Sequence, residues 1–448
     1  MKIPMAPPNV ASLLARLMPD ELGKLLAHST PLPAGRYLHW DDLRHRPPPD
    51  GLSSQTWWLA VCLARNPMLQ PLPFTSKEGK PFLLASPEPL LIHLHHIDRD
   101  AAGQIRMPEP SSIHEHRERY LLHSLIEESI TSSQLEGAST TRRVAEAMLR
   151  DGRQPRDRSE TMIFNNYQAM AQLRHLKSEP ITPAQLLELH RLITRDTLDD
   201  PADAGRLRRS DDVNVVDNRD GKLLHQPPGF KELPERLEKL CAFANADADS
   251  SPFVHPVVRA ILLHFMIGYD HPFADGNGRT ARALFYWSMA RSGYWLAEFL
   301  SISQFLRNAP RQYVQAYLHS ETDRNDATYF VLHQLEIIRR AIASLHDYLG
   351  RKIEEQKEAE NLLIKAGQLR AHLNHRQLAL LTHALKHPGE TYRVAKHQAV
   401  HDVVYQTARA DLLGLAELGL LVKFRQGNAF VFHAADNLAE CFQSLDRT

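Results

Sequence analysis

The sequence lacks the features of a secreted or membrane-spanning protein. Its 448 residues include only three cysteines, Cys62, Cys241 and Cys441, and their wide separation argues against a disulfide framework. No run of about 18 apolar residues occurs, so no membrane span is expected. The N-terminus carries prolines and charges where a signal peptide needs an apolar stretch. We therefore expect a cytoplasmic protein that has no membrane partner.

The sequence also lacks an excess of one charge. Lysine plus arginine number 53 and aspartate plus glutamate number 53, so the net charge is zero with histidine neutral. This balance does not indicate a nucleic-acid or membrane partner, although it is compatible with a small basic patch. The one local histidine cluster is His93, His95 and His96. Because its spacing matches no zinc pattern, we interpret it as part of a polar strand or loop.

The pattern of hydrophobic residues predicts a mainly α-helical chain of four regions. Residues 1–110 are rich in proline and form a small domain or an extended wrap of unclear role. Residues 111–350 contain most of the expected helices, residues 351–373 form a charged helical linker, and residues 374–448 form a separate domain. Helices are expected at 157–176, 182–197, 233–245, 255–269, 279–292, 311–318 and 328–348. Within 206–230, the segments VNVV, NRDG and KLLHQPP predict a β-hairpin.

The loop between two apolar helices, His271-Pro-Phe-Ala-Asp-Gly-Asn-Gly-Arg-Thr-Ala-Arg282, has the composition of a phosphate site. Gly276 and Gly278 let backbone N–H groups approach a ligand, and the following helix presents its positive end. Arg279 and Arg282 lie three apart, on one helix face, where they can hold successive phosphates. Each feature alone is compatible with an ordinary turn, but together they favour a polyphosphate ligand.

Two further side chains of this loop suggest chemistry. Asp275 is a carboxylate among phosphate-binding groups, which suits a ligand of Mg²⁺ (or Mn²⁺) that also binds phosphate oxygens. His271 directly follows a buried helix and is a candidate general base for a hydroxyl that attacks phosphorus. A histidine at a helix end can also be a satisfied core residue.

The same twelve residues match the Fic-family motif HPFx(D/E)GNGRxxR at every specified position, so the chain resembles a Fic-type protein adenylyltransferase. The resemblance implies transfer of AMP from ATP to a Tyr, Ser or Thr hydroxyl of a target protein. It makes His271 the base and Asp275 the metal ligand. Asn277 and the backbone of Gly276 and Gly278 would bind the α- and β-phosphates with Arg279, and Arg282 would bind the γ-phosphate.

Three other segments fit the same resemblance. Gly278 stands where Doc-like relatives that phosphorylate their targets carry lysine. Tyr313 stands near the expected adenine position, but the second tyrosine of the usual pair is Val314, so a core aromatic is an alternative. The hairpin within 206–230 resembles the flap that pairs with target backbone, with Leu224 and His225 at its nucleotide end.

An upstream segment resembles the inhibitory motif (S/T)xxxE(G/N) of many Fic proteins. Ser132, Glu136 and Gly137 supply its three specified positions, at the end of a helix expected at about 125–137. A carboxylate beside Arg282 would occupy the donors that the γ-phosphate needs. The resemblance therefore implies a self-inhibited enzyme. The alternative is a solvated glutamate at a helix end with Gly137 as the cap.

Residues 374–448 resemble a winged helix-turn-helix, in which Gln406-Thr-Ala-Arg409 begins a recognition helix that continues through LVKF, and RQGNAFVFH forms the wing. This module binds DNA or packs against protein. Three readings therefore stay open: an adenylyltransferase, a hydrolase that removes AMP at the same site, and a DNA-binding transcriptional regulator whose Fic domain mainly modifies itself. Expected partners are ATP, a protein with an acceptor hydroxyl and, as open alternatives, DNA or a second copy of the chain.

Overall fold

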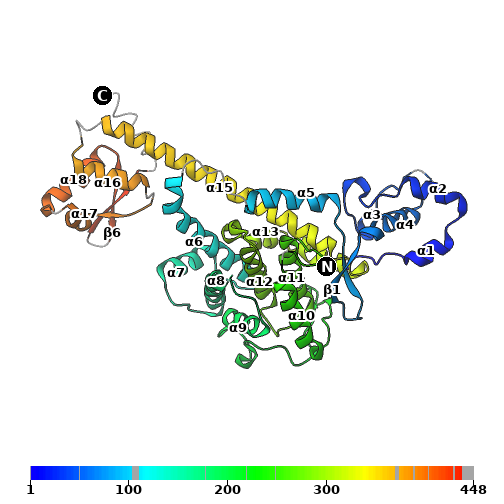
Figure 1. Ribbon diagram of the computed structural model, residues 1–448. Coiled ribbons are helices and arrows are strands. Elements are labelled where there is room, and N and C mark those ends of the chain that lie inside the picture. The colour runs from blue at the N-terminus through cyan, green and yellow to red at the C-terminus, as the bar shows by residue number, and fades with distance from the viewer. Residues whose placement is uncertain are drawn as a thin grey trace. The chain divides into compact units, whose positions relative to one another are not determined.

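The computed structural model describes residues 2–49, 51–102, 110–176, 178–217, 219–247, 249–368, 373–386, 389–401, 403–426 and 429–435. It divides into two compact units, Met1–Leu345 and His346–Thr448. Helices dominate and the strands are few and short (Figure 1), so the predicted mainly α-helical class is confirmed. Cys62 and Cys241 are buried and unpaired, while Cys441 lies outside the described residues. Among the described residues, no helix is long and apolar enough to cross a membrane.

The first hundred residues form helices and one β-hairpin. The elements are α1 Val10–Arg16, α2 Pro19–Ala27, α3 Trp40–Leu43, α4 Ser54–Arg65, β1 Gln70–Thr75, β2 Pro81–Leu84 and α5 Glu88–Ile97. The interpretation of the histidine cluster as a strand or loop is wrong, because His93, His95 and His96 lie on α5. Leu90, Leu94 and Ile97 give that helix its buried stripe at helical spacing, with the histidines between them. No metal-binding group of histidine, cysteine or carboxylate residues occurs in the described part of the chain.

This N-terminal region belongs to the same compact unit as the helical core. The buried Arg65 donates to the carbonyl of Leu38 at 3.0 Å and to the Tyr329 hydroxyl at 2.9 Å. Tyr37 donates to Asp326 at 2.6 Å. Since Tyr329 and Asp326 lie at the start of a long core helix, these buried polar contacts join the proline-rich region to the core.

The core consists of packed helices around two that are buried along almost their whole length. Its elements are α6 Pro110–Leu135, α7 Arg142–Asp151, α8 Arg158–Leu176, α9 Pro183–Thr194, β3 Val215–Val216, β4 Leu223–His225, α10 Leu233–Asn245, α11 Pro256–Asp270, α12 Asn277–Arg291, α13 Ile302–Asn308, α14 Pro310–Thr322 and α15 Thr328–Gln368. The two buried helices, α11 and α12, flank the His271–Arg282 loop. The predicted hairpin is present, with Val215 opposite His225.

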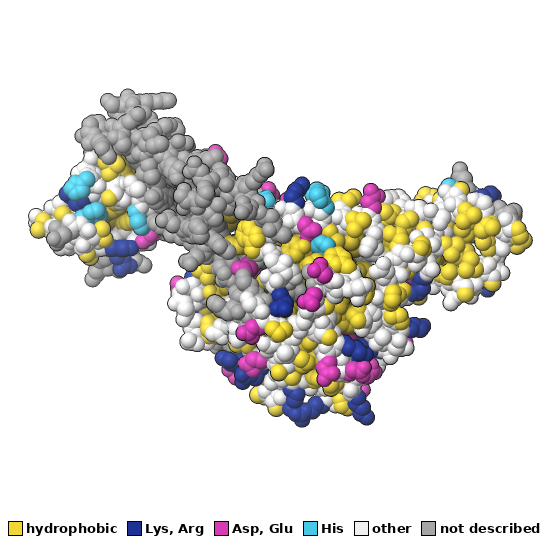
Figure 2. All heavy atoms as spheres, in the orientation of Figure 1, with side chains coloured by type: hydrophobic (Ala, Val, Ile, Leu, Met, Phe, Trp, Pro, Cys, Tyr) yellow, Lys and Arg dark blue, Asp and Glu magenta, His cyan; other side chains and the backbone are white. Residues whose placement is uncertain are grey.

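Two boundaries differ from expectation. Helix α12 begins at Asn277 rather than near Arg279, so the glycine-containing segment is itself the first turn of the helix. Helix α15 continues from Thr328 through Gln368, so most of the expected linker is the same helix as the expected 328–348 segment. On the face shown in Figure 2, acidic and basic side chains are interspersed over the core, as the zero net charge suggests.

The second unit contains helices and a three-stranded sheet. They are α16 His375–Lys386, β5 Tyr392–Arg393, α17 Val394–His401, α18 Tyr405–Glu417, β6 Leu421–Gln426 and β7 Ala429–Ala434, with strand order β5-β7-β6. The predicted continuation of the helix through Phe424 is wrong. Gly419 takes a left-handed conformation (φ 73°), and the N–H of Leu420 bonds to the carbonyl of Leu415 at 2.9 Å, which ends the helix before β6.

Candidate active site

His271 is held at the C-terminal end of α11 in a left-handed conformation (φ 44°, ψ 57°). Its Nδ1 lies 3.0 Å from the carbonyl of Gly268. Because a carbonyl can only accept, Nδ1 carries the proton and Nε2 has a free lone pair. Burial, the largest influence, lowers the pKa of His271 below its ordinary value. The imidazole is therefore neutral at pH 7 and can accept a proton at Nε2.

The glycine-containing turn is closely packed against neighbouring residues. A Cβ at Gly276, whose φ is 82°, would lie 2.6 Å from Cγ2 of Thr194, so only glycine fits there. The buried amide of Asn277 accepts from the N–H of Phe273 at 3.0 Å and donates to its carbonyl at 2.9 Å. Asn277 therefore uses its side chain to close the turn, which leaves its backbone N–H for a ligand.

The first turn of α12 has the geometry of an anion site. The first backbone hydrogen bond of α12 joins the N–H of Thr280 to the carbonyl of Gly276 at 3.0 Å. The three preceding N–H groups, of residues 277, 278 and 279, have no acceptor within the helix and lie at its positive end. A phosphate group is a suitable acceptor for them.

Arg279 supplies the clearest sign of an anionic ligand. The side chain is fully buried, and Nη1 donates to the carbonyl of Ile193 at 3.1 Å. Nε and Nη2 are buried without a hydrogen-bond partner among the described residues, and the Asp275 carboxylate lies 3.9 Å from Nη2. Buried guanidinium donors without acceptors are costly, and an oxyanion is the group that would satisfy them.

Arg282, one turn further along α12, is held by the end of α6. Nε donates to the Ser132 hydroxyl at 2.8 Å, while Nη2 donates to the Ser132 carbonyl at 2.9 Å and to Oε1 of Glu136 at 2.8 Å. Burial, the largest single influence, would lower the pKa of Arg282, but Glu136, Tyr313 and Glu128 together raise it. The predicted contact between the inhibitory segment and Arg282 is therefore present in the geometry.

The Glu136 carboxylate also covers the first turn of α12. A Cβ at Gly278 would overlap Oε1 of Glu136 and lie 2.7 Å from its Cδ. Burial, the largest single influence, acts to raise the pKa of Glu136, but Arg282, Arg279 and His271 together lower it. An ionised carboxylate, about 25% exposed, thus lies where the helix end and two arginines favour an anion.

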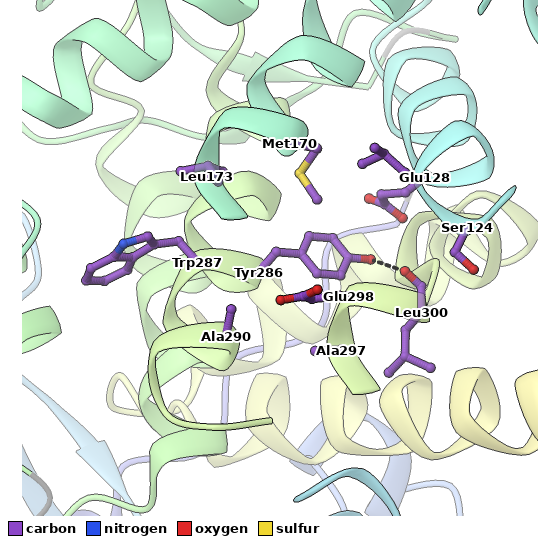
Figure 3. Close-up of a pocket in the computed structure, with 11 residues that line it drawn as sticks. Ser124, Glu128, Met170, Leu173, Tyr286, Trp287, Ala290, Ala297, Glu298 and Leu300 are labelled. Atoms are coloured by element: carbon purple, nitrogen blue, oxygen red, sulfur yellow. Dashed lines mark hydrogen bonds between the residues drawn. The ribbon is translucent and has the colours of Figure 1, made fainter. Parts of the chain in front are cut away.

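Two features fix the end of α6. Gly137 is left-handed (φ 95°), and the next N–H, of Ala138, bonds to the carbonyl of Ser133 at 3.0 Å, which is a Schellman cap. Further back, the buried Glu128 accepts from the hydroxyl of Ser301 at 3.0 Å and from the N–H of Ser303 at 3.1 Å. Figure 3 shows Glu128 and Ser124 from α6 facing Tyr286 and Leu300 beside a cavity of about 30 Å³.

Asp275 is a carboxylate that could hold a metal. Its side chain is about half exposed, and its carboxylate is 4.0 Å from Arg158 as well as near Arg279. One carboxylate fits Mg²⁺, which binds proteins through one or two carboxylates and completes its shell with phosphate oxygens and water. The donor set is therefore suited to a metal that arrives with a polyphosphate.

The flap hairpin lies beside the end of α11. His225 is buried, with Nε2 2.7 Å from the carbonyl of Tyr269 and Nδ1 2.7 Å from the carboxylate of Glu321. Leu224 is half-buried, while Val216 and Leu223 are exposed by 43% and 49%. The hairpin thus presents apolar side chains outward while His225 fastens its second strand next to His271.

Tyr313 lies at the side of Arg282, as part of an aromatic cluster. Its hydroxyl is 2.8 Å from Nε2 of His264, and its ring meets that of Tyr317 edge-on at 5.4 Å. Tyr317 stands one helical turn after Tyr313, so the two rings pack together in the cluster. Burial raises the pKa of both hydroxyls, and the charge of Arg282 opposes this rise.

Two residues that hold the loop, His190 and Arg208, were not predicted from the sequence. Nδ1 of His190 accepts from the N–H of Gly205 at 3.0 Å, so Nε2 carries the proton that it donates to the carbonyl of Asp275 at 2.9 Å. The ring stacks on Phe273 at 3.8 Å, and burial lowers its pKa to about 4. Arg208 donates to the carbonyl of His271 at 3.0 Å. Neither role has a local sequence signal, because each joins residues far apart in the chain.

Comparison with known proteins connects this geometry to one family. Residues 180–289 match the family model described as Fic/DOC family. The protein adenylyltransferase Fic of Drosophila virilis is 29% identical over 196 residues, which are 44% of this chain and 38% of that protein. The protein of the same name in Culex quinquefasciatus is 29% identical over 202 residues, 44% and 37% of the two chains. This chain therefore spans less than two fifths of the length of these curated relatives.

The fold is also found among solved structures. A Fic family protein from Desulfovibrio desulfuricans aligns with a TM-score of 0.51 and 18% identity, over 82% of this chain and 98% of that one. Since that alignment covers most of both chains at low identity, it supports a shared fold rather than a shared substrate.

Proposed function

We propose that this chain, whose residues 180–289 match the Fic/DOC family model, transfers AMP from ATP to a protein hydroxyl, and that Glu136 restrains the transfer. The observation that carries the proposal is the pair of unpartnered buried donors on Arg279, beside the N-terminal turn of α12 and next to a neutral His271. Polyphosphate, base and acceptor hydroxyl can meet at this place.

In the proposed reaction, His271 acts as the general base. Nε2 takes the proton of a Tyr, Ser or Thr hydroxyl as its oxygen attacks the α-phosphorus of ATP, and pyrophosphate leaves with the electron pair of the broken P–O bond. The N–H groups at the start of α12, with Arg279, orient the phosphates. Asp275 would hold Mg²⁺ or Mn²⁺, which neutralises polyphosphate charge when bound.

The proposed restraint results from competition between the Glu136 carboxylate and the γ-phosphate of ATP for the same position. The Glu136 carboxylate occupies donors of Arg282 and covers Gly278, where the γ-phosphate would otherwise lie. ATP would then bind with its α-phosphate out of line with the acceptor hydroxyl, and small misplacements of reacting atoms are costly. The ion pair is mostly buried, so salt would screen it little.

The proposal is tested by the position of a radioactive label. With ATP labelled at the α-phosphate, the Glu136→Gly variant is expected to label itself or proteins of a lysate, and with γ-labelled ATP it is expected to label nothing. Transfer of the γ-label instead would show phosphorylation and overturn the adenylyl assignment. Mass spectrometry of the labelled proteins would identify the acceptor residues.

The acid limb of the pH–rate profile is expected below pH 6.5 in the Glu136→Gly variant. Burial lowers the pKa of His271 from 6.5, and the Glu136 charge partly opposes this, so its removal lowers the pKa further. The base then stays neutral to lower pH, and transfer at ATP concentrations well below saturation, which reports the free protein, falls only there. The rate should be measured from acidic to neutral pH. A half-maximal rate above pH 6.5 would contradict the assignment of the base.

Replacing Asp275 by Asn is expected to weaken the affinity of the site for Mg²⁺. The Mg²⁺ concentration for half-maximal transfer should rise by about tenfold or more, since even groups that only orient a metal ligand contribute about tenfold to metal affinity. Asp199→Asn is the matched control, because Asp199 pairs with the same Arg158 but is 92% exposed. An unchanged Mg²⁺ titration in Asp275→Asn would remove this residue from the metal site.

Two other functions are each supported by a specific observation. Glu136 is ionised and partly exposed at the site, so it can also orient a water for removal of AMP from a modified protein. Release of AMP from a premodified protein by the wild type, and its loss in Glu136→Gly, would establish that activity.

The second unit favours the regulator alternative through its exposed polar residues. Tyr405, Gln406 and Arg409 are exposed on the first turns of α18, and Lys423 and Arg425 are exposed on β6. Retention on duplex DNA that falls steeply with salt would support a DNA-binding regulator, because phosphate contacts release counterions. Retention that is absent or independent of salt would favour a protein partner.

A further inference from the structure

Arg208 is a buried arginine that binds the backbone of the candidate base. It is only 4% exposed. Its Nε donates to the carbonyl of His271 at 3.0 Å, and its backbone N–H donates to the carbonyl of Pro272 at 2.9 Å. Arg208 therefore holds two successive carbonyls of the catalytic loop, 63 residues further along the chain.

The other nitrogens of the same guanidinium bind the two ends of the flap. Nη1 donates to the carbonyl of Ser210 at 2.7 Å and to the carboxylate of Asp211 at 2.8 Å. Nη2 donates to the carbonyl of Pro228. The Asp211 carboxylate also accepts from the N–H of Phe230 at 2.7 Å. The chain entering the flap and the chain leaving it are thus joined at one point, which we call the flap root (Ser210, Asp211, Pro228 and Phe230).

The backbone that Arg208 holds is one that needs support. His271 lies in the left-handed region (φ 44°), where a side chain with a Cβ is unfavourable. Such a conformation persists when neighbouring contacts fix it. Its N–H and Nδ1 are bound to carbonyls of α11, at Ile267 and Gly268, and Arg208 binds its carbonyl from the opposite side.

We propose that Arg208 is a positioning residue that fixes the flap root and His271 in one geometry, so that a protein bound along the flap meets the base in register. The inference rests on the proposed function, which makes His271 the base and the hairpin the target-binding element. Arginine is required because its planar fork reaches acceptors on three sides, whereas lysine has a single compact ammonium group.

The test compares Arg208→Lys with Arg191→Lys, both in the Glu136→Gly background. Arg191 is an exposed arginine that pairs with Glu188 in the same helix, at 2.6 Å, so its replacement controls for loss of an arginine fork. Hydrogen exchange of the backbone should be measured by mass spectrometry for the flap root and for residues 269–273. ATP affinity and the rate of automodification at saturating ATP complete the comparison.

In Arg208→Lys, we expect faster exchange at the flap root and at residues 269–273 together. Automodification should fall by about tenfold to a hundredfold, the effect of misplacing reacting groups slightly. ATP affinity should not change, because Arg208 touches no residue of the phosphate site. Arg191→Lys should match its parent in every measurement.

Faster exchange confined to the flap root, or an automodification rate equal to that of the parent, would overturn the inference. Should Arg208→Lys unfold, Asp211→Asn provides the second variant. Its carboxylate is largely exposed, and the change weakens only the bridge from Arg208 to Phe230. It should raise exchange at both places to a smaller degree, and unchanged exchange at 269–273 would count against the inference. If the parent transfers no AMP at all, the proposed function fails, while coupled exchange still decides the positioning role.

Discussion

Replacing Glu136 by glycine is expected to raise automodification and the labelling of other proteins by about a hundredfold, the scale set by restoring aligned reacting atoms. The variant frees the donors of Arg282 and uncovers the first turn of α12 above Gly278. A γ-phosphate can then occupy the place of the carboxylate. The measurement is incorporation of α-labelled ATP into the purified protein and into a lysate, at equal protein concentration and over equal times.

Two variants control this experiment. Glu136→Gln keeps the size of the side chain without its charge, so it separates loss of the ion pair from loss of bulk. Glu146→Gln removes a carboxylate that pairs with Arg150 on the surface of α7 and should leave labelling unchanged. Equal labelling by the wild type and Glu136→Gly would show that the carboxylate is a helix-end residue that does not restrain the enzyme.

Replacing His271 by alanine in the Glu136→Gly background should abolish detectable transfer and leave ATP binding intact. General bases contribute about a hundredfold to ten-thousandfold to a rate, and the contact of Nδ1 with the carbonyl of Gly268 leaves Nε2 to accept the proton. The phosphates are expected to bind to Arg279, Arg282 and backbone N–H groups, none of which the substitution removes. Transfer and nucleotide affinity should be measured separately on the same preparation.

His271→Asn is the matched variant for backbone geometry. Asparagine tolerates the left-handed conformation better than alanine does, so it removes the base with little change in the path of the chain. Both variants should be equally inactive. Transfer near the parent rate in either would take the role of base away from His271, and loss of ATP binding in Asn as well as Ala would make it a nucleotide-binding residue instead.

The sequence was most informative where a site is contiguous. The catalytic loop and the start of α12 lie within twelve residues, and their spacing alone predicted which groups share a place. Ser132 and Glu136 were found from a motif, and their contact with Arg282 spans 150 and 146 residues of chain. That contact could be expected only because the helix-end pattern and the phosphate loop together suggested one site.

The residues that sequence analysis missed act through tertiary packing. His190 reaches Asp275 across 85 residues and Arg208 reaches His271 across 63, and both bind backbone carbonyls, which leave no trace in residue types. Tyr317 meets the ring of Tyr313 edge-on from one helical turn further along, a contact that no adjacent pair in the sequence indicates. The α5 error has a similar origin, since three histidines obscured a buried stripe of only three apolar residues.

The left-handed conformation of His271 has a consequence for the evolution of such chains. Glycine or asparagine suits that position of the backbone better, and histidine there gives up about 1–2 kcal/mol of folding stability. On the proposed function, selection for proton transfer would maintain it. In descendants whose enzymatic role has lapsed, drift toward greater stability should replace the histidine first, with the surrounding helices intact. The residue at this position would thus report whether a copy still works as an enzyme or survives as a scaffold.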